Sequence, residues 1–115
     1  MNKDKVIINK RDYTTQIQRS DTELAQGMQG RMWNDIQSMY FVLKPQMQSF
    51  HTRNCLVPMD IVFCLHGKVF KIFPNCPPNS NRSYVSFADA VIELPANTVF
   101  QHKIIPGQSV TLWQD

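Results

Sequence analysis

The chain has 115 residues, of which 43% are hydrophobic and 18% are charged, and its formal net charge is +3 at pH 7. This length suits one domain with one modest core and is too short for two independent domains. No apolar run approaches the roughly 18 residues of a membrane-spanning helix, so we expect a soluble protein that does not bind membranes.

All of the excess positive charge lies in the first 20 residues, where five lysines and arginines outnumber two aspartates. We expect residues 1–12 to be a solvated basic arm and residues 13–115 to form one β domain. Nucleic-acid binders gather positive charge on a face or groove, so we expect no nucleic-acid partner. The start of the chain lacks the apolar stretch of about 7–15 residues that a secretory signal needs, and we expect a cytoplasmic location.

The first predicted elements are a strand and a short helix. Residues 13–19 alternate threonine with aromatic and β-branched types, which is typical of a half-buried strand. Ser20 and Glu23 have the spacing of a capping box, in which each side chain accepts a hydrogen bond from the other residue's backbone N–H. This predicts a helix over about residues 21–30, weakened by its two glycines.

Strand patterns then dominate. Residues 38–43 predict a strand that ends at Lys44-Pro45, because proline cannot donate to a ladder. Residues 49–57 predict another strand, although polar residues interrupt it. His66-Gly67 has the character of a two-residue hairpin turn and predicts a hairpin over residues 59–73.

The last third of the chain predicts a loop and two further strands. Three prolines among turn formers indicate an irregular loop over residues 74–83. Residues 89–95 and 109–113 predict strands, and residues 96–104 fit either a strand or a short helix. The pattern as a whole predicts an all-β fold, a small antiparallel β-barrel or jelly-roll-like sandwich with one short N-terminal helix.

The cysteines and histidines do not indicate a metal site or any other cofactor. Cys55, Cys64 and Cys76 contain no C-x-x-C spacing, and one must stay unpaired. Cys55 and Cys64 lie in apolar surroundings and should behave as small buried hydrophobes. We expect Cys76, next to two prolines, to lie in a loop and to be the most easily oxidised of the three.

Several motifs in order give the chain a family resemblance over about residues 13–112. They are Glu23, Gly27 and Met28 with Arg31 nearby, the strand at 39–43, a central signature from Phe50 to Phe63, and the segments 91–98 and 104–110. In these features the chain resembles the bacterial and archaeal family known as domain of unknown function 192. The resemblance implies a small β-barrel or jelly-roll-like sandwich and implies no activity, because the family is uncharacterised.

The chain departs from that family pattern at two places. His51-Thr52 replaces the usual tryptophan and methionine, and Asn97 replaces a glycine. Asparagine tolerates left-handed φ better than other non-glycine residues, so we expect the turn at Asn97 to survive.

A polar patch around Arg53, Asn54 and Asp60 is the candidate functional site. In one interpretation it is structural, with Arg53 paired to Asp60 first, or to Glu23 or Glu93, because a buried guanidinium needs a carboxylate partner. In the other it forms a pocket for an anionic or sugar-like small molecule. The candidate ligand-binding residues are then Arg53, Asn54, Asp60, His51, Glu23 and Arg31.

We therefore expect a binding module for a small ligand or a protein. The alternative is a hydrolase or isomerase in which His51 and Asp60 act as the catalytic pair. The sequence contains no G-x-S-x-G elbow, P-loop, H-E-x-x-H or dinucleotide fingerprint.

Overall fold

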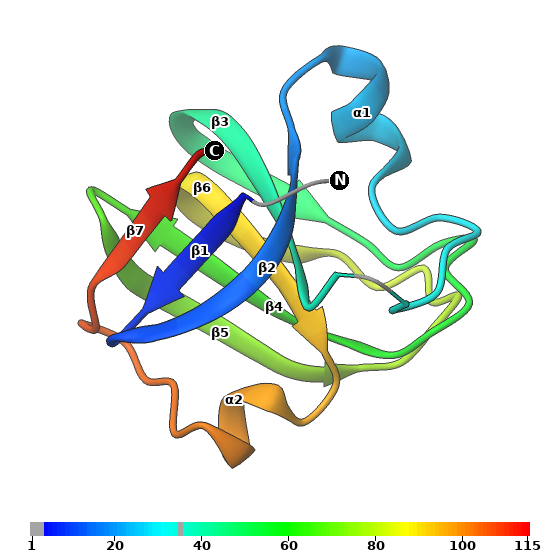
Figure 1. Ribbon diagram of the computed structural model, residues 1–115. Coiled ribbons are helices and arrows are strands. Elements are labelled where there is room, and N and C mark those ends of the chain that lie inside the picture. The colour runs from blue at the N-terminus through cyan, green and yellow to red at the C-terminus, as the bar shows by residue number, and fades with distance from the viewer. Residues whose placement is uncertain (1–3, 35) are drawn as a thin grey trace.

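The computed structural model describes residues 4–34 and 36–115 and shows, within these residues, one curled seven-stranded sheet with a short helix at each end (Figure 1). The strands follow the sheet order β5-β4-β6-β3-β2-β1-β7. The elements in chain order are β1 (Lys5–Ile8), β2 (Arg11–Gln18), α1 (Asp21–Gln26), β3 (Ser38–Phe50), β4 (Met59–Leu65), β5 (Lys68–Cys76), β6 (Tyr84–Pro95), α2 (Thr98–Gln101) and β7 (Val110–Trp113).

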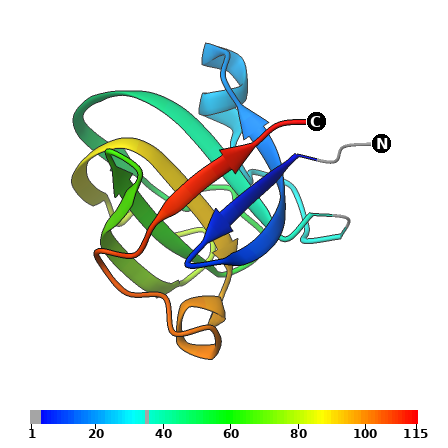
Figure 2. The ribbon, with the colours of Figure 1, turned by 60° about the vertical axis from the view of Figure 1, so that its left-hand side comes forward.

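The curl brings the two ends of the sheet toward each other (Figure 2). Lys68 of β5 forms an isolated antiparallel bridge with Ser109, just before β7, and the Val69 N–H donates to the Gln108 carbonyl at 2.9 Å. The expectation of a mainly β fold is confirmed. It is corrected in two details, because β2 pairs with β3 in parallel and because a second helix, α2, is present.

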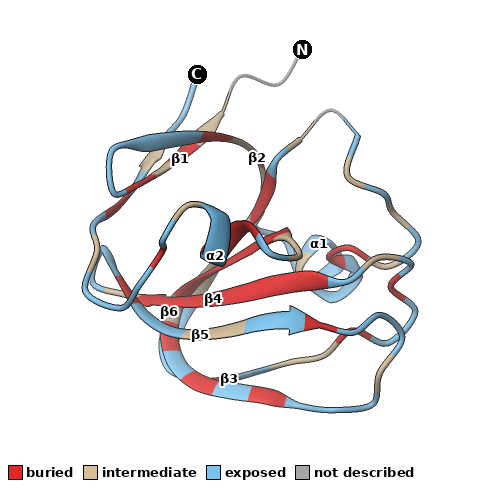
Figure 3. Ribbon diagram, turned by 90° about the horizontal axis from the view of Figure 1, so that it is seen from below, coloured by how far each residue is buried: buried red, intermediate tan, exposed pale blue. Residues whose placement is uncertain are grey.

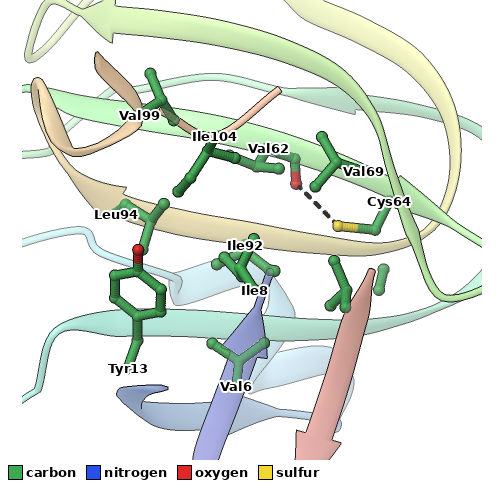
Figure 4. Close-up of a cluster of buried hydrophobic side chains, with 12 residues drawn as sticks. Val6, Ile8, Tyr13, Val62, Cys64, Val69, Ile92, Leu94, Val99 and Ile104 are labelled. Carbon is green, nitrogen blue, oxygen red and sulfur yellow. Dashed lines mark hydrogen bonds between the residues drawn. The ribbon is translucent and has the colours of Figure 1, made fainter. Parts of the chain in front are cut away.

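β4 is buried along almost its whole length because both of its faces are covered (Figure 3). Val62 and Cys64 belong to a first hydrophobic cluster inside the curl, where they meet Ile8 of β1 and residues of β6 (Figure 4). Ile61 and Phe63 point to the other face and join a second cluster beneath α1. A strand buried on both faces is a nearly continuous apolar run, which explains the sequence of β4.

The N-terminal residues are part of the sheet. β1 pairs with both β2 and β7, and Val6 and Ile8 are buried in the first cluster. The expectation of a solvated arm is therefore wrong for residues 5–12, because the apolar side chains of β1 complete the core. Residues 1–3 lie outside the described part of the chain.

β3 continues through Pro45 instead of ending there. Its pairing with β6 shifts register between Val42 and Gln46. Such an irregularity tolerates a proline, since the ladder is interrupted at that point and no N–H is needed.

Residues 51–58 form turns and not the expected strand. Asn54 has φ 61°, and the Cys55 N–H donates to the Thr52 carbonyl at 3.0 Å. The polar residues that interrupt the pattern here are therefore turn residues.

The hairpin of β4 and β5 is confirmed. His66 and Gly67 both have positive φ, 52° and 74°, as a two-residue turn of the primed type requires. β5 runs on to Cys76, so the loop covers only residues 77–83. Cys76 is the last residue of β5, is buried, and its Sγ donates to the Phe73 carbonyl at 3.2 Å, so the expectation that it lies in a loop is wrong.

The capping box of α1 is confirmed. The Glu23 N–H donates to Ser20 Oγ at 3.1 Å, and the Ser20 N–H donates to Glu23 Oε1 at 2.9 Å. The helix ends at Gln26, earlier than expected, because Gly27 takes φ 48°. Neither helix in residues 4–34 and 36–115 is long and apolar enough to cross a membrane.

Candidate functional site

A cavity of about 240 Å³ lies between α1 and the sheet. The segment after α1 is tied to the turns at 51–58, since Gln29 bridges Cys55 and the Gly30 N–H donates to the Asn54 carbonyl at 3.1 Å. The helix and the turns therefore form facing walls. The lining consists of residues 24–29, then Phe41, Leu43, Ser49 and Phe50 of β3, then His51, Cys55 and Glu93.

Polar and apolar groups contribute about equally to the walls, and the apolar side is closely packed. The rings of Phe41 and Phe50 meet edge to face with centroids 5.0 Å apart. A Cβ added at Gly27 would lie 3.2 Å from Phe41 Cζ, and the positive φ there also favours glycine. Gly27 thus lets the end of α1 approach Phe41 and close one side of the cavity.

Glu93 is the most deeply buried polar residue of the cavity lining. It lies in the central strand β6, paired with Met39 of β3 and Ile61 of β4, and its side chain projects into the second cluster's side of the sheet with Val91. It is 3% exposed, and its Oε1 has no hydrogen-bond partner within the described residues. Burial raises the pKa of Glu93 to about 8, so its carboxyl is mostly protonated at pH 7.

The other titratable groups of the lining are also neutral at pH 7. Burial, and next the charge of Arg53, lower the pKa of His51, whose Nδ1 accepts the Arg53 N–H at 3.1 Å. This hydrogen bond leaves the proton of the neutral ring on Nε2. Burial, followed by the nearby Glu93, raises the pKa of Cys55 to about 11, which keeps its thiol protonated and unreactive.

Asp60, expected to pair with Arg53, has a different role. It is fully buried, and its Oδ1 accepts the N–H groups of Asn75 at 2.8 Å and Asn97 at 3.2 Å, while its Oδ2 accepts that of Val99 at 2.9 Å. The side chain of Asn97, the N-cap of α2, makes no capping bond, so Asp60 serves as the cap. Asp60 therefore fixes α2 to the sheet.

The expected ion pair between Arg53 and Asp60 is wrong. Arg53 is exposed and belongs to none of the ion pairs in the described ranges, because backbone N–H groups already occupy the Asp60 oxygens. The same ranges contain no His51–Asp60 ion pair. His51 and Asp60, the proposed catalytic pair, are therefore not in direct charge contact in this part of the chain.

The remaining predicted site residues do not gather around one point. Asn54 is exposed, and its N–H donates to Asn79 Oδ1 at 3.1 Å. Glu23 is engaged in the capping box. Arg31 Nη1 donates to Gln16 Oε1 at 2.9 Å, and both residues line a second hollow of about 500 Å³. Of the six predicted ligand-binding residues, only His51 lines the cavity beneath α1.

Sequence reasoning considered Glu93 only as a possible partner of Arg53 and missed it as a site residue. The available signal was a single carboxyl within the apolar run 90–94 of a predicted strand. A carboxyl in such a run must be buried, and a buried carboxyl needs an explanation.

Comparison with known proteins gives one family and several structures of the same fold. The sequence model of the DUF192 family, described as "Uncharacterized ACR", matches residues 5–112. A protein of unknown function from Novosphingobium aromaticivorans DSM 12444 is 26% identical with a TM-score of 0.87, and the match covers 95% of this chain and 84% of that one.

A second solved structure, named a "putative transcription regulator" from Sinorhizobium meliloti 1021, is 22% identical with a TM-score of 0.86. The match covers 95% of this chain and 91% of that one and supports the fold alone. No curated protein matches the chain.

Proposed function

The chain belongs to the DUF192 family. We propose that it binds one small organic molecule, with apolar and polar parts, in the cavity between α1 and the sheet, and that Glu93 holds the polar end of the ligand. The observation that carries this proposal is a buried carboxyl, Glu93, that lines the cavity and whose Oε1 has no hydrogen-bond partner within the described residues. An unpaired buried polar group costs about 1–3 kcal/mol, which a ligand that completes the hydrogen bond would recover.

The lining supports a small ligand that has an apolar part as well as polar groups. Leu24, Met28, Phe41, Leu43 and Phe50 supply apolar surface, and the volume is below the roughly 300–1,000 Å³ of sites for drug-sized molecules. The exposed residues Ala25 and Ser49 also line the cavity, so it is open to solvent where they lie.

Binding is favoured over the hydrolase or isomerase alternative. Asp60 uses its oxygens to hold three backbone N–H groups and cannot also orient His51. The Cys55 thiol keeps its proton at neutral pH. Asp60 and Cys55 are therefore better suited to structural and packing roles than to the roles of a catalytic base and a nucleophile.

The test is an amide NMR titration with a panel of single-ring aromatic and alicyclic molecules that each carry one polar group. We expect at least one probe to shift the resonances of residues 24–29 and Glu93. Ala25→Trp, on the wall of the cavity, should abolish this response. Thr22→Trp, exposed on α1 outside the lining, is the matched control and should keep it.

The proposal fails if no probe at millimolar concentration shifts these resonances, or if Ala25→Trp responds like the wild type.

We also propose a cytoplasmic location. All three cysteines are free and buried, and free thiols are typical of proteins from a reducing compartment. Cell fractionation of the native host with an antibody against this protein would test the location, and recovery in an exported fraction would contradict it.

A further inference from the structure

We propose that the molecule bound in the cavity is a small organic cation, an ammonium group carried on apolar substituents, which forms an ion pair with Glu93. This inference rests on the proposed function and adds the chemical class of the ligand.

The charge inventory of the cavity favours a cation. Glu93 is the single carboxyl among the described lining residues, and none of these residues is a lysine or an arginine. Glu93, once ionised, would therefore lack the positive partner that a buried carboxylate requires. An ammonium ligand supplies that partner and a hydrogen-bond donor for the unpaired Oε1.

The walls are suited to an ammonium group with apolar substituents. Phe41 and Phe50 both contribute aromatic rings, and aromatic faces attract ammonium groups that come within about 6 Å of the ring centre. The C-terminal turn of α1 also lines the cavity, and its carbonyl end adds a weak negative potential. Leu24, Leu43 and Met28 would surround the substituents of the ligand.

An anion does not fit this lining. Arg53, the residue expected to bind an anionic ligand, is exposed and does not line the cavity. A carboxylate or phosphate would meet the carbonyl end of α1 and, from about pH 8 upward, an ionised Glu93, and both repel negative charge.

Binding of the cation must release a proton. The ammonium ion arrives charged and the Glu93 carboxyl is mostly protonated at pH 7, so the ion pair forms as the carboxyl O–H bond breaks and its proton leaves to solvent. The other titratable groups in the lining are His51 and Cys55, with Arg53 acting on His51 from outside. Both His51 and Cys55 stay neutral near pH 7, so the released proton comes from Glu93.

The experiment compares benzylamine, benzyl alcohol and benzoate, which share one ring and differ in the charge of the substituent. Calorimetry on the full chain should show that benzylamine binds at least tenfold more tightly than either of the others at pH 8. Its affinity should rise several-fold for each pH unit from 6 to 8, as the ionised fraction of Glu93 rises. The heat of binding at pH 7 should depend on the buffer, because a proton is released.

Glu93→Gln should remove both the preference for the amine and the pH dependence. Asp21→Asn, which removes an exposed carboxylate of α1 outside the lining, is the matched control and should change neither. The pH series on the wild type is an independent test that needs no variant.

If the probes bind, three results would overturn the inference. They are equal affinity for the amine and the alcohol, an amine affinity independent of pH, and an amine preference that survives Glu93→Gln. Binding of benzyl alcohol in the cavity without a preference for the amine would leave the proposed function standing and remove only the cation. Failure of all three probes would reject the cation, and the NMR panel would then decide the proposed function.

Discussion

Replacing Glu93 with glutamine changes the pH dependence of stability in a direction that the structure fixes. Glutamine has nearly the same shape as a protonated glutamate and cannot ionise. Because the wild-type carboxyl is 3% exposed and Oε1 has no partner in the described chain, its ionisation opposes folding.

The magnitude follows from the pKa of Glu93 in the two states. In the unfolded chain the carboxyl has a pKa near its ordinary value of 4.5, and burial raises it to about 8 in the native state. Between these values the unfolded state binds fewer protons, so the free energy of unfolding falls as pH rises. One pKa unit corresponds to about 1.4 kcal/mol, which gives a total loss of at most about 5 kcal/mol, fully present above pH 8 and absent below pH 4.5.

Urea unfolding followed by far-UV circular dichroism at pH 5, 7 and 9 measures this loss. The wild type and Glu93→Gln share every other titrating group, including His51 and His102, so the difference between their unfolding free energies isolates Glu93. We expect the variant to gain about 3–4 kcal/mol relative to the wild type from pH 5 to pH 9.

Parallel pH curves, in which the difference stays constant within about 0.5 kcal/mol, would refute this reasoning. They would mean that Glu93 is solvated or paired in the native protein, and the charge argument for a cationic ligand would fail with it. Asp21→Asn should give a curve parallel to that of the wild type, because Asp21 is exposed.

Three further predictions concern the rest of the chain. Asp60→Ala should lower the free energy of unfolding by at least about 3 kcal/mol, because three N–H groups lose their acceptor. Arg53→Ala, at an exposed position, should change it by less than about 0.5 kcal/mol. Equal losses for the two variants in urea titrations would mean that Arg53 and Asp60 do form an ion pair. Because Asn97 has φ 76°, Asn97→Ala should lower the free energy of unfolding by about 1 kcal/mol in the same assay, and Asn97→Gly by less than about 0.5 kcal/mol. An alanine variant as stable as the wild type would contradict the left-handed turn. The three buried cysteines should react with a thiol reagent far more slowly in the native protein than in urea, and fast native labelling at pH 8 would contradict their burial.

The sequence by itself determined the features that depend on neighbouring residues. The capping box of Ser20 and Glu23 and the hairpin turn at His66-Gly67 are present as expected. Asn97 adopts the left-handed φ that its position in the turn requires. Each depends on backbone geometry over two to four residues, which the side chains at those positions control directly.

Features that depend on distant pairing were decided only by the tertiary structure. The N-terminal segment has a sequence compatible with a solvated arm, and it becomes β1 because β2 and β7 supply partners on both sides. Pro45 would end an isolated strand, and β3 passes it because the register shift against β6 removes the need for an N–H.

The two buried carboxyls show how far the sequence alone predicts the candidate site. Asp60 and Glu93 both lie in apolar runs of strands, and the local pattern does not distinguish them. Asp60 meets backbone N–H groups 15, 37 and 39 residues away, whereas Glu93 meets a cavity between α1 and the sheet. A hydrogen-bond acceptor is satisfied by whatever the folded chain brings within about 3 Å of it, and chain segments far apart in sequence decide that.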